Sequence, residues 1–222
     1  MSTLVIDAST YVGTTALFRG ASVAADGSAA MRGRDAEALM PMVADTLARA
    51  GISPRELTRV VCGAGPGSFT SLRIAASIAK GIALGAGVPL FAVSSLALLA
   101  GGNGSPSPGA YLAVLDALRG EAYVGGYAVS ARGEVSVMHA EGLVRQSDVG
   151  ELASSLGAVT VGPGQTIDRA PLARAAIALE SIIRERGPVD LASWEPGYGR
   201  KAEAQMRWEA SHRRPLPSGG AA

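Results

Sequence analysis

Short apolar runs, separated by turns that contain glycine, open the chain. This pattern is typical of strands that pair in an antiparallel meander. The three runs are Leu4–Ile6, Thr14–Phe18 and Ser22–Ala25. The period of the pattern then changes, because apolar residues recur at spacings of three and four over Asp35–Ala50, up to Gly51. That spacing predicts a helix with one apolar stripe, which the glycine ends.

A strand, a glycine-proline loop and a long helix follow. Arg59–Cys62 is a strand-like run, and the loop Gly63–Gly67 turns the chain so that Ser68 can cap a helix of about five turns. A further strand at Pro89–Val93 and a short helix after Ser94-Ser95 complete the first half of the chain. The order of these elements predicts an α/β fold.

The breaker-rich stretch Gly101–Gly109 (GGNGSPSPG) predicts a domain boundary. After it the pattern restarts, since Tyr111–Leu115 leads into Asp116 as Leu4–Ile6 leads into Asp7. We interpret this as an internal duplication and expect an N-terminal lobe over 1–102, a C-terminal lobe over 103–212 and a disordered tail over 213–222. The remaining predicted strands are Glu121–Ser130, Glu134–His139 and Ala158–Val161, and the remaining predicted helices are Ser147–Leu156 and Pro171–Arg186.

Composition narrows the class of protein. The 222 residues are 48% hydrophobic with a net charge of +1, which predicts a folded chain without the basic surplus of a protein that grips nucleic acid by itself. The first residues lack the features of a signal peptide, and no apolar run approaches the roughly 20 residues that span a membrane. We expect a cytoplasmic protein without a membrane partner. The single cysteine, Cys62, lies in an apolar strand and is expected to be buried.

Two lobes that each open with a strand, an aspartate and a turn match the plan of the actin-like ATPase and sugar kinase (ASKHA) fold, with a mixed sheet and flanking helices in each lobe. Working members clamp nucleotide phosphates between these two turns, where glycine lets backbone amides approach. Here Ser9 takes the place of such a glycine, so we expect Asp7 and Asp116 to hydrogen-bond their own turns. We predict no bound cofactor.

Candidate catalytic and metal-binding residues are not found. The loop Gly63–Gly67 lacks the Gly-Lys-Ser/Thr ending of a P-loop, and Pro66 removes an amide donor. His139 and His212 are the only histidines, and neither has a cysteine or carboxylate partner at ligand spacing. We therefore predict no catalytic and no metal site. We assign the loop a structural role, and its residues are Gly63, Gly65, Pro66, Gly67 and Ser68.

The long helix after this loop is apolar nearly all round, which is typical of a helix in a core or against another chain. Its alanines permit close approach of a second helix. We predict that it joins the first helix in a surface for a partner subunit; the alternative is a helix sandwiched within its own lobe. The candidate interface residues are Leu39, Met40, Val43, Leu47, Phe69, Leu72, Arg73, Ala76, Ala79 and Lys80.

The stretch GAGPGSFTSLRIAASIAKGIALGAGVPLFAVSSLALLA resembles the signature of the TsaB (YeaZ) family. The opening LVIDAST and the later VLDALRGEAYVGGY are also similar to that family, so the resemblance covers nearly the whole chain. Ser71 stands where the family has glycine, and Asp35 stands where a histidine is common.

The resemblance implies a non-catalytic subunit of the machinery that makes N6-threonylcarbamoyladenosine in tRNA. It implies a catalytic partner, TsaD, bound through the N-lobe helices, an ATPase partner, TsaE, and a homodimer where TsaD is absent. Contact with tRNA is expected only through the complex. The alternative is a stand-alone ATPase or a glycoprotease-like (M22) hydrolase. Ser9 in the first turn, where a glycine would be expected, and the lack of metal ligands and of a nucleophile with a base disfavour this alternative.

Overall fold

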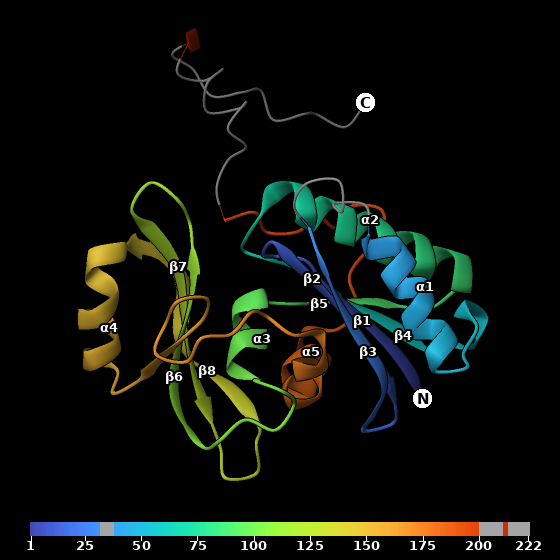
Figure 1. Ribbon diagram of the computed structural model, residues 1–222, viewed down its shortest axis with the longest axis horizontal. Helices are drawn as coiled ribbons and strands as arrows, with labels where there is room; N and C mark the ends of the chain where they lie inside the picture. The colour runs from blue at the N-terminus through green and yellow to red at the C-terminus, as the bar shows by residue number, and fades with distance from the viewer. Residues whose placement is uncertain (32–37, 200–210, 213–222) are drawn as a thin grey trace.

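The computed structural model describes residues 1–31, 38–199 and 211–212 and contains two sheets that lie side by side, each with its own helices (Figure 1). The first sheet has the strand order β3-β2-β1-β4-β5. β1 to β3 form the predicted antiparallel meander, and β4 and β5 continue the sheet in parallel with β1. The strands are β1 (Ser2–Asp7), β2 (Val12–Arg19), β3 (Ser22–Ala30), β4 (Arg59–Gly63) and β5 (Leu90–Val93).

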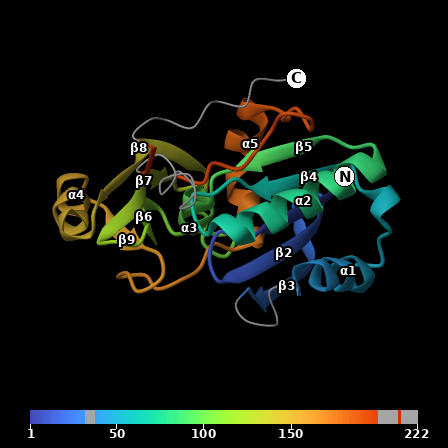
Figure 2. The same cartoon turned by 90° about the horizontal axis from the view of Figure 1, so that it is seen from above.

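Two helices cover one face of the first sheet. α1 (Leu39–Arg49) packs on β2 and β3, and α2 (Phe69–Ala86) packs on β4 (Figure 2). α2 has 18 residues, which confirms the predicted five turns, and Gly87 ends it with φ of +68°. A short 3₁₀ turn, η2 (Pro54–Glu56), lies between α1 and β4. The predicted first turn of the α1 helix, with Asp35, lies outside the described residues.

The second sheet repeats the first, with the strand order β8-β7-β6-β9. β6, β7 and β8 are antiparallel neighbours, and β9 pairs in parallel with β6 as β4 does with β1. This shared topology confirms the predicted duplication. The elements are β6 (Gly109–Asp116), β7 (Glu121–Val129), β8 (Val135–Arg145), η3 (Gln146–Asp148), α4 (Val149–Ser155) and β9 (Val159–Val161).

The single helix predicted over Pro171–Arg186 is wrong, since the structure has two shorter elements. η4 (Ala173–Leu179) is a 3₁₀ helix, and α5 (Glu180–Arg186) continues it as an α-helix. Ala173, Ala176 and Leu179 are all buried at a spacing of three. A 3₁₀ helix aligns residues three apart, so this geometry turns all three side chains toward the same core.

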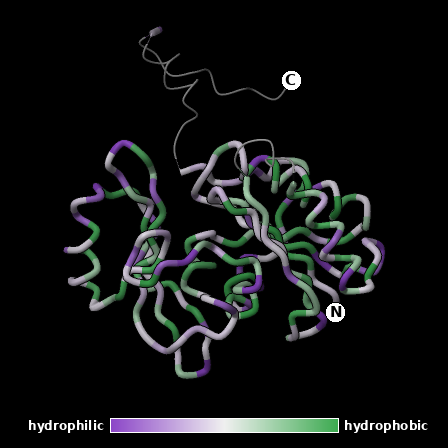
Figure 3. Tube along the Cα trace, viewed as in Figure 1, coloured by the Kyte–Doolittle hydropathy of each residue, from purple (hydrophilic) through white to green (hydrophobic). Residues whose placement is uncertain are grey.

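The described residues form three apolar cores around the two sheets. One contains residues of both sheets and lies around α3 (Ser95–Ala100), η4 and α5, between the sheets in Figure 1. The second lies between the first sheet and α1 and α2, and the third between the second sheet and α4. Figure 3 shows hydrophobic residues concentrated along the strands and the seam between the sheets. The shared core joins the two lobes into one packed body.

Polar contacts also join the seam elements η4 and α5 to the first sheet. The Arg59 guanidinium donates to both carboxylate oxygens of Glu180, over 3.0 and 2.6 Å, and its Nε donates to the Thr3 hydroxyl over 2.9 Å. At the other side of the seam, the Thr14 hydroxyl accepts from the backbone N–H of Ala173 over 3.0 Å. These contacts fix η4 and α5 against β1, β2 and β4.

The chain returns to the first lobe after α5. The N–H of Val189 donates to the carbonyl of Leu90, the N–H of Gly197 donates to the carbonyl of Ala64, and Trp194 packs against the core beneath α2. The predicted lobe boundaries had placed all of 103–212 in the second lobe, whereas residues 188–197 lie on the first. The tail over 213–222 lies outside the described residues, and no helix of the described part is long and apolar enough to cross a membrane.

Candidate functional site

The turn after β1 is built around a buried carboxylate. Asp7 is fully buried, and its Oδ1 accepts hydrogen bonds from the Ser9 backbone N–H over 3.0 Å and the Ser9 hydroxyl over 2.8 Å. This confirms that Asp7 bonds its own turn. Its Oδ2 also accepts from the Ser95 hydroxyl over 2.5 Å, a long-range contact that the sequence pattern did not predict. Both carboxylate oxygens are therefore engaged within the protein.

The glycine-proline loop lies directly on this turn. A Cβ at Gly63 would stand 1.9 Å from Asp7 Oδ2, and a Cβ at Gly67 would stand 2.1 Å from the Ser9 carbonyl oxygen. The Ser68 N–H donates to the same carbonyl over 2.7 Å. The loop thus packs closely on the backbone of the turn after β1.

Ser68 occupies the predicted N-cap position of α2 but does not cap with its side chain. Its hydroxyl pairs with the Ser71 hydroxyl over 3.1 Å instead. The backbone bond from the Ser68 N–H to Ser9 is what holds the start of α2 on the first turn. Ser71, which departs from the family signature, is therefore part of this junction.

Burial raises the pKa of Asp7 above its usual value, and the hydrogen bonds from Ser95 and Ser9 offset part of that rise. The folded state consequently holds a proton on Asp7 more tightly than the unfolded chain does. We expect the wild type to gain stability relative to Asp7→Asn as the pH falls from neutral toward the unfolded-state pKa of 3.8. Urea denaturation of both proteins across that range checks this, and a relative loss on acidification would contradict it.

The second turn resembles the first in one respect. The Asp116 carboxylate accepts from the Leu118 N–H over 2.7 Å, as predicted for a self-bonded turn. Leu118 and Arg119 take positive φ values of 62° and 58°, and the Leu118 side chain is exposed. Leu118 thus lies on the surface of the turn.

The remaining candidate chemical groups lie apart. Cys62 is buried in β4, as predicted, and burial raises the pKa of its thiol well above the usual range. His139 is half-buried on β8, far along the chain from the exposed His212. Within the ranges that the structure describes, no three histidine, cysteine or carboxylate side chains gather as a metal site would require.

The predicted partner surface needs correction. Six of its ten residues are buried within this chain, and Leu39, Val43, Leu47 and Ala79 belong to the apolar core between the first sheet and its helices. The six are Leu39, Val43, Leu47, Leu72, Ala76 and Ala79. For these residues the alternative, a helix packed within its own lobe, is the one that the structure supports.

The other four predicted residues reach the surface. Met40 and Arg73 are exposed, and the Phe69 ring lies between Arg73, 5.2 Å from the ring centre, and the Tyr198 ring, 4.4 Å away. The half-buried Lys80 lies 5.9 Å from the centre of the Trp194 ring. The segment that returns after α5 therefore borders α2 on one side.

The outer surface of the two helices is formed by Met40 and five residues outside the predicted set. On α2, Ser77, Gly81 and Gly85 are exposed at a spacing of four, and a Cβ at either glycine would meet nothing within 4 Å. On α1, Met40, Ala44 and Ala48 repeat the same spacing. The recurrence of small residues every four positions could have indicated this face from the sequence. We call these six residues the outer face.

The family model and the curated relatives that match this chain are both named for the threonylcarbamoyl modification of tRNA. Residues 32–153 match the model of the family described as TsaD, tRNA N6-adenosine threonylcarbamoyltransferase. The TsaB protein of Bacillus subtilis, named for tRNA threonylcarbamoyladenosine biosynthesis, is 29% identical over 96% of this chain and 100% of its own length. The TsaB protein of Escherichia coli is 35% identical over 74% of this chain and 72% of its own.

A solved structure is similar over nearly its whole length. YeaZ from Pseudomonas aeruginosa superimposes with a TM-score of 0.75 and 26% identity, covering 89% of this chain and 99% of that one. The two-lobed ASKHA fold predicted for the chain is confirmed.

Proposed function

Since this chain belongs to the TsaB family, we propose that it is a non-catalytic scaffold subunit for the synthesis of N6-threonylcarbamoyladenosine in tRNA. In this proposal it acts in the cytoplasm, binds TsaD through the N-lobe helices and allows TsaE to join. It pairs with a second copy of itself where TsaD is absent, and tRNA is contacted only through the complex. The relatives named TsaB over most of the chain carry the proposal.

The outer face of α1 and α2 supports a role in binding another helix. Exposed glycine in a helix costs up to about 1 kcal/mol relative to alanine, and it leaves the helix surface low enough for a second helix to approach closely. The outer face is bordered on α2 by half-buried isoleucines, Ile74, Ile78 and Ile82, and Leu84 is 75% exposed. A low, apolar strip of this kind is suited to a helical partner.

The alternative, a stand-alone ATPase or hydrolase, has less support. Asp7 uses both carboxylate oxygens within the protein, and the loop from Gly63 lies against its turn. A nucleotide phosphate would have to displace that loop, which also begins α2.

Reconstitution tests the proposed function. We expect purified TsaD and TsaE to modify tRNA with threonylcarbamate when this chain is added, and to lose that activity when it is omitted. Modification at an equal rate without the chain would overturn the scaffold role. Sedimentation of the chain alone and with TsaD measures the two proposed pairings.

Gly81→Glu probes the outer face directly. Position 81 is exposed and has open space, so the fold and its melting temperature should be retained. A carboxylate placed in a close helix seam should weaken TsaD binding by about a hundredfold or more. Binding is measured by titration calorimetry, and modification of tRNA should fall with it.

Gly150→Glu is the matched control. Gly150 is also an exposed helical glycine with nothing within 4 Å of a Cβ, but it lies on α4 of the second lobe. This variant should bind TsaD as the wild type does. Equal affinities for both variants would show that the partner surface lies away from α2.

A further inference from the structure

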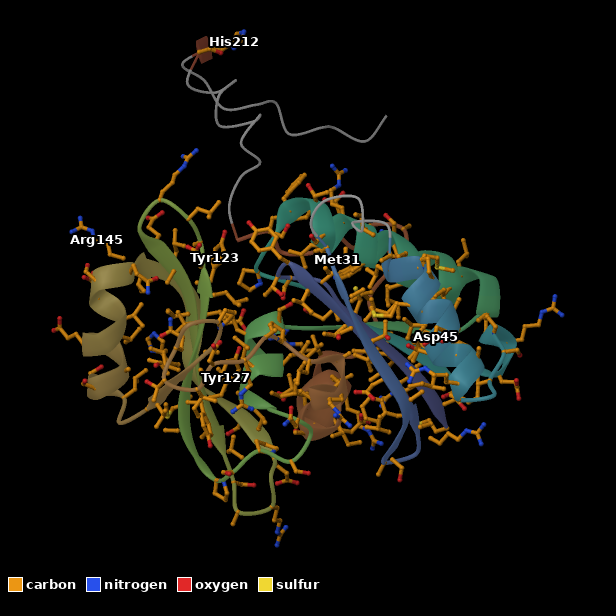
Figure 4. The ribbon with its side chains drawn as sticks, in the orientation of Figure 1. Met31, Asp45, Tyr123, Tyr127, Arg145 and His212 are labelled. Carbon is orange, nitrogen blue, oxygen red and sulfur yellow. The ribbon has the colours of Figure 1, made fainter. Side chains whose placement is uncertain are left out.

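A cavity of about 470 Å³ lies between the two lobes, on the side of β8 and α5. Pro66 and Trp194 contribute to its wall from the first lobe, and Tyr123 and Leu143 contribute from the second. Figure 4 shows Tyr123 and Tyr127 on the side of β7 that faces the first lobe. The volume lies in the range of small-molecule sites, which are mostly apolar with a few polar groups.

Three charged side chains line this cavity, namely Glu141, Glu195 and Arg186. One oxygen of Glu141 accepts the Tyr127 hydroxyl over 2.5 Å, which leaves the other oxygen available. Within the described residues, no hydrogen bond or ion pair is formed by the side chains of Arg186 and Glu195. The site therefore offers one cation and two anions beside apolar walls.

This arrangement selects among ligand classes. The lining charges sum to −1, counting Arg186 as +1 and the two glutamates as −1 each, so a phosphate-bearing nucleotide would meet net repulsion. A zwitterion would place its carboxylate on the guanidinium and its ammonium near the glutamates. An apolar or aromatic body would fill the space beside Tyr123 and Trp194.

We propose that this interlobe cavity binds a zwitterionic α-amino acid with an apolar or aromatic side chain. The site is distinct from the outer face of α1 and α2, and the proposal is independent of any partner. Its occupant would touch both lobes at once, so binding should stabilise their seam.

Three related probes test the two charge contacts with the full chain. L-phenylalanine carries both charges, phenethylamine lacks the carboxylate, and 3-phenylpropanoate lacks the ammonium. By titration calorimetry we expect L-phenylalanine to bind with a Kd of about 1 mM or tighter and each analogue to bind at least about tenfold more weakly. An analogue that binds as well as L-phenylalanine, AMP that binds better, or no binding of L-phenylalanine would overturn the proposal.

Variants then assign the contacts. Arg186→Gln should weaken L-phenylalanine binding about tenfold or more while leaving phenethylamine unchanged, and Glu195→Gln should weaken both. Glu185→Gln, which is exposed and outside the cavity, should leave all three affinities unchanged. Because Arg186 and Glu195 are exposed, their variants should keep the wild-type melting temperature without ligand. Unaltered L-phenylalanine binding by Arg186→Gln would refute the assigned pose.

Discussion

Replacing Gly67 with alanine is expected to destabilise the protein by on the order of 3–5 kcal/mol. Gly67 has φ of +156°, in a region that other residues rarely adopt, and an added Cβ would stand 2.1 Å from the Ser9 carbonyl oxygen. That oxygen belongs to backbone and accepts the Ser68 N–H over 2.7 Å, so it cannot move away without loss of the bond that starts α2. Chemical denaturation of the purified variant measures the loss.

Gly20→Ala separates the cost of a positive φ from the cost of the clash between the added Cβ and its neighbours. Gly20 also has a positive φ, of +61°, but a Cβ there would meet nothing within 4 Å. It should therefore show only the backbone penalty, about 1–2 kcal/mol. If Gly67→Ala lost no more stability than Gly20→Ala, the close packing of the loop on the Asp7 turn would not matter to the fold.

The strands and most helices of this protein could be predicted because each has a local signal. Alternating or continuous apolar runs between glycine turns identified β1 to β7, and the repeated strand and aspartate at Asp7 and Asp116 indicated the duplication. The division of Pro171–Arg186 into η4 and α5 has no such signal. It arises because a core that residues of both lobes share, many of them far away in sequence, takes up side chains at a spacing of three.

Near the loop Gly63–Gly67, two long-range contacts could not be predicted from the sequence. The bond from Ser95 to Asp7 joins residues 88 positions apart. The contact of Trp194 with the core beneath α2 joins the end of the chain to its first half. Neither follows from a periodic pattern, because residues 188–197 form no helix of their own and pack only where the first lobe already exists.

The orientation of α2 shows the limit of periodicity most clearly. Alanine or isoleucine occurs on nearly every side of this helix, so its apolar stripe does not identify one buried face. The structure buries Ala75, Ala79 and Ala83 and leaves Ser77, Gly81 and Gly85 exposed. The sequence could predict a helix that makes close contacts on two sides, but not which side belongs to the sheet and which remains for a partner.

Ala79→Glu and Gly81→Glu should therefore have opposite consequences, although they place the same charge two residues apart on one helix. Ala79 is fully buried in the cluster that contains Val60 and Cys62 of β4, whereas Gly81 is exposed. A carboxylate at position 79 has neither a partner nor water, and burying it should cost several kcal/mol, about as much as the whole stability of many domains. The Ala79→Glu protein should consequently fail to fold and should aggregate.

Circular dichroism, size-exclusion chromatography and a thermal melt of the two variants distinguish the outcomes. Gly81→Glu should remain a folded, soluble protein and fail only in binding TsaD, so that its defect lies in the partner surface. Ala79→Glu should lose the melting transition altogether, so that its defect lies in the lobe. A soluble Ala79→Glu protein with a wild-type melt would mean that α2 is rotated relative to the sheet. In that case the partner-facing residues would be Leu72, Ala76 and Ala79, as the sequence analysis predicted. An apolar helix face that does not pack on its own lobe is exposed and is suited to bind a partner.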